Sequence, residues 1–265
     1  MAEFDSYTSL GWHLFPAAPE LLLWAKYAAP IAQKIARDPA QRAKWLRSGG
    51  TWFVGVNALS NDAEGRLPGG PPLAGAARRF VEAHISAKSF DWDRAQISVC
   101  TRGYPQPSAE ESSAAFRFRR DRDAAHVDGL LPVGPKRRRY WQETHRFILG
   151  VPLNDAGPHA APFVVWERSH QIIAAAFSKA LRPHPPKHWS DIDLTEIYQK
   201  ARQEVFDRCK RVEISAKPGQ SYISHPLAVH GVAPWPEHLS GPAQGRMIAY
   251  FRPNMTADEA LPLLT

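Results

Sequence analysis

The spacing of apolar residues divides the chain into a helical first third and a β-rich remainder. Helical stripes of apolar residues occur at 19–27, 31–46 and 74–85. Pro30 is expected to begin or interrupt the second of these helices, and the Gly- and Pro-rich stretch 65–72 predicts a loop. The first part of the chain therefore predicts helical support, with one short strand at 51–56.

From about residue 94 the pattern changes to short apolar runs separated by turn residues. The expected strands are residues 95–100, 146–153, 163–166, 211–215, 220–224 and 247–251. A long segment, 171–209, interrupts them, and its second part, 191–209, has helical spacing. Several short strands after a helical start indicate an α+β protein with a barrel or jelly-roll core.

The chain shows no internal repeat and no clear linker. We therefore expect a single domain, 1–265, in which 1–93 is mainly helical support and 94–253 is the jelly-roll core. No apolar run approaches the length that spans a bilayer, and the first 15 residues lack a signal-peptide core. Cys100 and Cys209 fit neither a disulfide framework nor a zinc motif, so a cytoplasmic location is expected.

The net charge of +7 is concentrated in two basic clusters, residues 117–122 and 136–139. The simplest interpretation is a solvated loop in which acids are interleaved with the arginines. Because the clusters flank residues 126–128, they also favour attraction of an anionic small-molecule substrate to a site there. Nucleic acid is the less favoured partner, and no membrane is expected.

Candidate metal ligands occur at His126, Asp128 and His230. Residues two apart on a strand point to the same face, so His126 and Asp128 can aim into one cavity. Two histidines and a carboxylate are the ligand set of non-haem Fe(II) oxygenases. About one His-x-Asp/Glu triplet is expected by chance in this composition, so the triplet gains weight only from its surroundings. A surface or core histidine is the alternative at each position.

His225 competes with His230 for the third position, five residues earlier. We favour His230 because Leu227-Ala228-Val229 resembles a strand and Gly231 offers a tight exit from it.

Arg246 opens the strand 247–251 after a turn-rich stretch, and by parity it shares a face with Ile248, Tyr250 and Arg252. An arginine on the interior face of a small barrel needs a carboxylate, which its planar fork binds well. It is thus a candidate anchor for an acidic cosubstrate, with an exposed hairpin arginine as the alternative.

Taken in order, His126-Val127-Asp128, residues 161–170, His230-Gly231 and Arg246 resemble the phytanoyl-CoA hydroxylase-like family of Fe(II)/2-oxoglutarate dioxygenases. The resemblance covers roughly residues 95–253. Here Arg168 stands where the family usually has Gly, Val232 replaces a hydroxyl residue, and the interval from His230 to Arg246 is longer than usual.

The resemblance implies a double-stranded β-helix (jelly-roll, cupin-like) core with a helical insert. It implies His126, Asp128 and His230 as catalytic Fe(II) ligands, with 2-oxoglutarate and O2 as cosubstrates. Arg246 would then bind the distal carboxylate of 2-oxoglutarate, with Arg252 as the alternative anchor. Gln96 is a further candidate contact to that cosubstrate, or a glutamine on a solvated strand face.

The implied reaction is hydroxylation of a small molecule at a C–H bond, with release of succinate and CO2. Asp128 argues against the halogenating relatives, which lack this ligand. Ser169 and His170 are expected to be structural. Two other classes stay open: a nucleic-acid dealkylating dioxygenase, which pairs two arginines six residues apart as Arg246 and Arg252 are, and a non-enzymatic, metal-silent jelly-roll binding protein.

Overall fold

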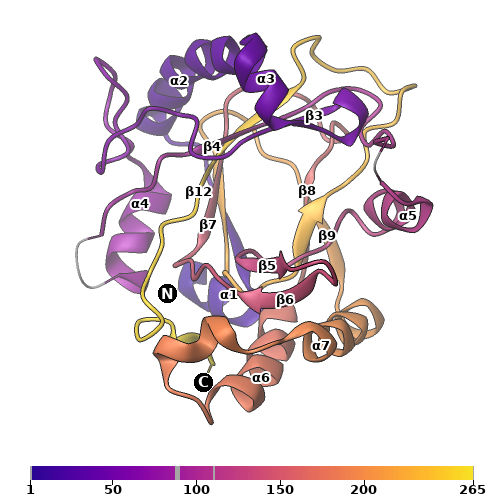
Figure 1. The fold of residues 1–265 in the computed structure, drawn as a ribbon. Helices are drawn as coiled ribbons and strands as arrows, with labels where there is room; N and C mark the ends of the chain where they lie inside the picture. Colours follow the sequence, from indigo (N-terminus) through magenta and orange to yellow (C-terminus); the bar gives the residue numbers. More distant parts are fainter. Residues whose placement is uncertain (1, 87–89, 110, 265) are drawn as a thin grey trace.

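The computed structural model describes residues 2–86, 90–109 and 111–264. Its centre is an antiparallel sheet of seven strands, several of which are labelled in Figure 1. The strand order is β1-β10-β7-β12-β4-β3-β2. The strands are β1 Trp12–Phe15, β2 Leu46–Arg47, β3 Trp52–Gly55, β4 Gln96–Cys100, β7 Ile148–Pro152, β10 Ser221–Ser224 and β12 Arg246–Phe251.

A smaller antiparallel sheet packs against one face of the first. Its order is β11-β8-β9, with bounds β8 Phe163–Trp166, β9 Arg211–Ile214 and β11 His230–Val232. Residues of both sheets form one apolar cluster between them, including Phe163, Tyr222, Ile248 and Tyr250. A separate hairpin pairs β5 Leu130–Val133 with β6 Arg138–Trp141.

Helices cover the other face of the large sheet. They are α1 Ala2–Leu10, α2 Pro19–Arg37, α3 Pro39–Trp45 and α4 Ala76–Phe80, which continues into a π-helical turn at Val81–Ile85. Alternation along β12 separates the two sides: Met247, Ala249 and Phe251 join the core under these helices, whereas Ile248 and Tyr250 face the small sheet.

The insert folds as α6 Ser169–Leu181 and α7 Thr195–Arg208, which pack together against the outer face of the small sheet. Figure 1 shows them below the β5–β6 hairpin, with α5 Ser113–Asp121 to one side. Short 3-10 turns lie at Ser48–Gly50, Pro186–Asp191 and Leu261–Leu264. None of the helices in the described ranges is long and apolar enough to cross a membrane.

All seven expected strands are present within a few residues of their expected ends, and helices and antiparallel sheets make up the α+β fold. Several expectations are wrong in detail. Pro30 lies inside a continuous α2, whose face is buried through Ala25, Ala28 and Ala32, so packing outweighs the lost hydrogen bond. The cluster 117–122 is mostly helix α5 and not a loop, and 227–229 is a turn that precedes β11.

Arg168 provides a test of local strain. It precedes α6 with φ 67° and ψ 1°, the left-handed conformation that favours Gly, and its side chain is exposed. We expect Arg168→Gly to raise the free energy of unfolding by about 0.5–1 kcal/mol. Arg168→Ala retains the Cβ atom and is the matched control without that gain. Thermal and denaturant unfolding measure both variants, and an equal response of the two would contradict the strain argument.

Candidate metal centre and its cavity

His126 and His230 face each other directly across a two-residue bridge between distant segments. The amide of each donates to the carbonyl of the other, at 2.9 and 3.0 Å. Each Nδ1 lies 2.9 Å from the carbonyl oxygen two residues earlier, that of Ala124 for His126 and that of Ala228 for His230. An Nδ1–H that donates to a carbonyl leaves Nε2 with its lone pair free, which is the tautomer that binds a metal.

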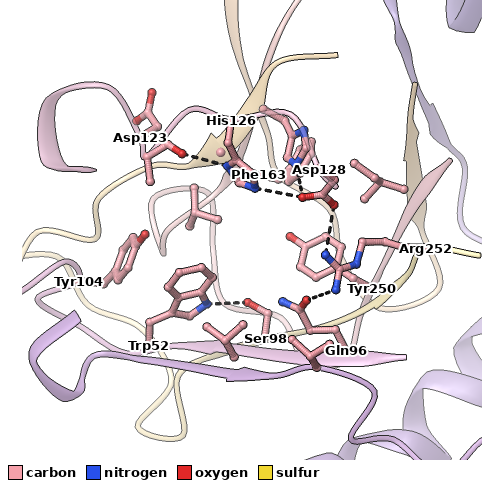
Figure 2. Close-up of a pocket in the computed structure, with 17 residues that line it drawn as sticks. Trp52, Gln96, Ser98, Tyr104, Asp123, His126, Asp128, Phe163, Tyr250 and Arg252 are labelled. Carbon is pink, nitrogen blue, oxygen red and sulfur yellow. Dashed lines mark hydrogen bonds and ion pairs between the residues drawn. The ribbon is translucent and has the colours of Figure 1, made fainter. Parts of the chain in front are cut away.

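Asp128 completes the group. Its Oδ1 lies 3.2 Å from Nε2 of His126 and 3.6 Å from Nε2 of His230 (Figure 2). One candidate ligand atom from each of the three residues lies within 4.8 Å of the other two. Ligands about 2.1 Å from a metal at right angles are about 3 Å apart, so the three atoms suit one face of a divalent ion.

The second carboxylate oxygen of Asp128 contacts Arg252, which in turn is bonded to Gln96. Nη1 of Arg252 lies 3.3 Å from Oδ2 of Asp128, and its Nη2 donates to Oε1 of Gln96 at 2.7 Å. Burial would raise the pKa of Asp128, but the charge of Arg252, together with the contacts to His230 and His126, holds that pKa well below its usual value. Gln96 is 8% exposed on the inner face of β4, so the solvated-face alternative for it is wrong.

Removal of Arg252 should shift the pH dependence of metal binding. In Arg252→Leu the largest group that lowers the pKa of Asp128 is lost and burial raises it, so protons compete with metal at a higher pH. We expect the midpoint of Co(II) binding to move to higher pH than in the wild type. Arg94→Leu, which removes a side chain bonded to the carbonyl of Leu59, is the control. An unchanged midpoint in Arg252→Leu would contradict this role.

The loop before His126 is fixed by an ion pair between the buried carboxylate of Asp123 and the exposed Arg211. Asp123 and Ala124 both have φ 53°, and the Asp123 carboxylate receives two hydrogen bonds from Arg211, at 2.7 and 2.8 Å. The Asp123 carbonyl also accepts the amide of Val232 at 3.0 Å. The loop is thus held against β9 and β11, and this places His126 opposite His230.

Gly231 allows this close approach. It lies within β11 and not at a turn, so the exit expected after His230 is wrong. A Cβ atom at Gly231 would lie 2.1 Å from the Asp123 carbonyl oxygen, too close for any adjustment short of a backbone shift. We expect Gly231→Ala to lower the free energy of unfolding by about 1–3 kcal/mol and to weaken metal binding. Unfolding curves and Co(II) titration that match the wild type would contradict this.

The rival ligand, His225, lies elsewhere. Its ring packs on His170 and Tyr7, at centroid distances of 4.8 and 5.8 Å, and burial lowers its pKa well below the usual value. Ser169 and His170 are structural in this structure: the Ser169 hydroxyl accepts the Val229 amide, and Nε2 of His170 lies 2.9 Å from the Thr8 carbonyl.

A cavity of about 210 Å³ opens beside the three candidate ligands, and we call it the central cavity (Figure 2). Its walls are mainly apolar and come from both sheets. They include Trp52, Val54, Ile148, Phe163 and Val232. Phe163 stacks on the His230 ring at 5.4 Å and lies 4.9 Å from the Tyr222 ring, which limits the water next to the ligands.

Arg246 lies on the inner face of β12 and is buried, with only 5% of its surface exposed. Its Nε donates to the Ala161 carbonyl at 2.7 Å, but Nη1 and Nη2 have no hydrogen-bond partner among the described residues. The ionisable groups that interact most with its charge are hydroxyls and a thiol, of Tyr250, Cys100, Tyr222 and Tyr104. Tyr250 and Tyr104 also line the central cavity. A buried guanidinium without a counter-charge is costly, so this position favours an added anion.

The structure therefore brings together His126, Asp128 and His230, and it places Gln96 on the cavity wall, with Arg246 buried close to Tyr104 and Tyr250. Sequence reasoning missed Trp52 and Ser98, which meet in a 3.0 Å hydrogen bond on the cavity floor. Alternation within β3 and β4 was the available signal, since Trp52 and Val54 share the face of Ser98.

No protein-family model and no curated protein sequence matches the chain. Solved structures do. One is SnoK, a non-heme alpha ketoglutarate dependent carbocyclase from nogalamycin biosynthesis, with 13% identity, a TM-score of 0.52 and coverage of 96% of this chain and 83% of that one. The chain shares the fold of SnoK. AviO1 from Streptomyces viridochromogenes Tue57 gives 14% identity and a TM-score of 0.49, over 95% of this chain and 93% of that one. HygX from Streptomyces hygroscopicus was solved with nickel, 2-oxoglutarate and hygromycin B. It has 12% sequence identity and a TM-score of 0.44, with coverage of 95% of this chain and 85% of that one.

Proposed function

We propose that this protein is an Fe(II)- and 2-oxoglutarate-dependent oxygenase of the phytanoyl-CoA hydroxylase-like type, which hydroxylates a small molecule at a C–H bond. The observation that carries the proposal is the convergence of two free Nε2 atoms and a buried carboxylate on one point beside a cavity. The fold shared with a non-heme alpha ketoglutarate dependent enzyme supports it. On this proposal the two packed sheets are a double-stranded β-helix within a single domain.

His126, Asp128 and His230 would hold Fe(II). Two imidazole nitrogens and one carboxylate on one face leave the opposite positions open, as non-haem oxygenases require. Carbonyls fix the orientation of both rings, and Arg252 fixes that of the carboxylate, so the ligands are preorganised without the metal.

Arg246 would bind the distal carboxylate of 2-oxoglutarate. Its two unpartnered Nη atoms offer the fork that a carboxylate accepts, and the surrounding tyrosine hydroxyls keep the position polar. Arg252 is already bonded to Asp128 and Gln96, which disfavours it as the anchor. The side-chain oxygen of Gln96 already accepts a hydrogen bond from Arg252. Its amide nitrogen is therefore the atom available to a cosubstrate in the cavity.

Bound Fe(II) and 2-oxoglutarate would supply the oxidation of a substrate C–H bond by O2, with succinate and CO2 as products. The chain contributes the rest: an ordered ligand face, a counter-charge for the cosubstrate, and apolar walls at Trp52, Ile148 and Phe163 that exclude water from the reacting atoms.

The test is succinate release from 2-oxoglutarate with Fe(II), O2 and ascorbate, alone and with a library of small molecules. We expect slow uncoupled release by the protein alone and stimulation by a substrate. Stimulation by an alkylated oligonucleotide instead would favour the nucleic-acid alternative. Absence of release from iron-loaded protein under all these conditions would favour the metal-silent alternative.

A further inference from the structure

A second cavity lies on the far side of His126 from the central cavity, and we call it the arginine pocket. It encloses about 180 Å³ between α5, α7 and the β5–β6 hairpin. Its charged and aromatic lining residues are Glu111, Phe118, Arg119, Arg139, Tyr198 and Arg202. His126 and Ala124 line both cavities, so the pocket ends at a candidate metal ligand.

The charges in the arginine pocket do not balance. Arg119 is neutralised by Glu111, whose Oε1 accepts two hydrogen bonds from it, at 2.6 and 3.1 Å. Arg139 and Arg202 have no carboxylate partner among the described residues. Their guanidinium groups donate to the carbonyls of Leu130 and Ala125, at 3.2 and 3.5 Å, and Arg202 also contacts the Tyr198 side chain. The neighbouring Arg138, by contrast, is paired with Asp193 and Glu196.

Both free guanidinium groups are held in place and partly removed from water. The guanidinium carbon of Arg202 lies 4.6 Å from the centre of the Phe118 ring and 5.2 Å from that of Tyr198. Burial, followed by repulsion from Arg137 and Arg202, lowers the pKa of Arg139. The two positive charges repel each other, and each loses hydration in the pocket. A bound oxyanion would offset both the repulsion and the lost hydration.

We propose that the arginine pocket binds a carboxylate or phosphate group of the primary substrate through Arg139 and Arg202. This inference rests on the proposed oxygenase function for the identity of the ligand as substrate. A group held there lies beside His126, whose side chain is partly exposed and lines both cavities, so the rest of the substrate would extend past His126 towards the central cavity. The pocket thus selects small anionic molecules and sets which carbon is presented for oxidation.

The test is calorimetric titration of metal-free protein with inorganic phosphate and, separately, with acetate, at constant ionic strength. The variants are Arg139→Gln and Arg202→Gln. Arg117→Gln is the matched control, because it removes one exposed charge from α5 and does not line the pocket. We expect saturable binding of one or both anions, at least about tenfold weaker in the two pocket variants and unchanged in the control. The anion that binds identifies the group.

A selenate soak of crystals locates the anion, because selenium scatters anomalously. A peak between the guanidinium groups of Arg139 and Arg202 supports the proposal, and a peak only beside Arg246 overturns it. Absence of saturable binding, or equal weakening in the Arg117→Gln control, also overturns it. Neither experiment needs iron or oxygen. A failure of succinate release would therefore contradict the oxygenase proposal, whereas anion binding in the pocket would still be tested independently.

Discussion

Asp128→Ala is expected to abolish 2-oxoglutarate-coupled turnover and to weaken divalent-metal binding by more than about 100-fold. The loss of a partner that merely orients a ligand costs 10- to 100-fold in metal affinity, and removal of the ligand itself should exceed that. The variant also leaves Arg252 without its ion-pair partner, next to two histidines. The remaining ligand face would be two neutral imidazoles with uncompensated positive charge beside them.

Calorimetric titration with Co(II) and the succinate assay measure the two effects. Asp155→Ala is the matched control, because this exposed carboxylate contacts only Lys217, at 3.4 Å, and the amide of Gly157, at 3.2 Å, among the described residues. We expect the control to keep the metal affinity and turnover of the wild type. Wild-type turnover in Asp128→Ala would rule out the proposed ligand set, and equal losses in both variants would point to a general effect of lost charge.

Arg246→Met should raise the 2-oxoglutarate KM by about 30-fold or more while Co(II) affinity stays unchanged. Truncation of one partner of a buried, hydrogen-bonded charge pair costs about 2–5 kcal/mol, and Met retains most of the apolar volume. In the structure Arg246 has two buried Nη atoms without a hydrogen-bond partner or counter-charge among the described residues. We therefore expect Arg246→Met to be at least as stable as the wild type when 2-oxoglutarate is absent.

A comparison with Arg252→Met shows which of the two arginines binds 2-oxoglutarate. Arg252→Met removes the partner of Asp128 and is expected to weaken metal binding first, with 2-oxoglutarate KM affected only through the metal. Steady-state succinate release against 2-oxoglutarate, at saturating metal, separates the two variants. If Arg252→Met raised the KM and Arg246→Met did not, the anchor would lie at the other end of β12.

The regular parts of the fold were predictable because alternation and apolar runs determine which face a strand buries. Along β12 the expected parity of Arg246, Ile248 and Tyr250 is confirmed, and it follows from the two-residue period alone.

The strand β1 and the β5–β6 hairpin were missed. Strands of the same length, such as β8, were identified by a continuous apolar run. That run is interrupted here by His13 in β1, Pro132 in β5 and two arginines in β6.

The site was predictable in its residue types but not in its contacts. His126 and Asp128 are close in sequence, whereas the salt bridge of Asp128 to Arg252 and the pair Asp123–Arg211 span 124 and 88 residues. Such partners depend on how the sheets pack, which no local pattern encodes. The role of Gly231 was likewise invisible, because it depends on the approach of the Asp123 carbonyl from another segment.

The proposed metal centre can be observed directly in crystals of the protein grown anaerobically with Co(II) and 2-oxoglutarate. We expect one cobalt anomalous peak at about 2.0–2.2 Å from Nε2 of His126, Nε2 of His230 and a carboxylate oxygen of Asp128. We also expect 2-oxoglutarate on that metal with its distal carboxylate at Arg246. A cobalt ion bound elsewhere, or no metal at these three side chains under saturating conditions, would contradict the proposed metal centre.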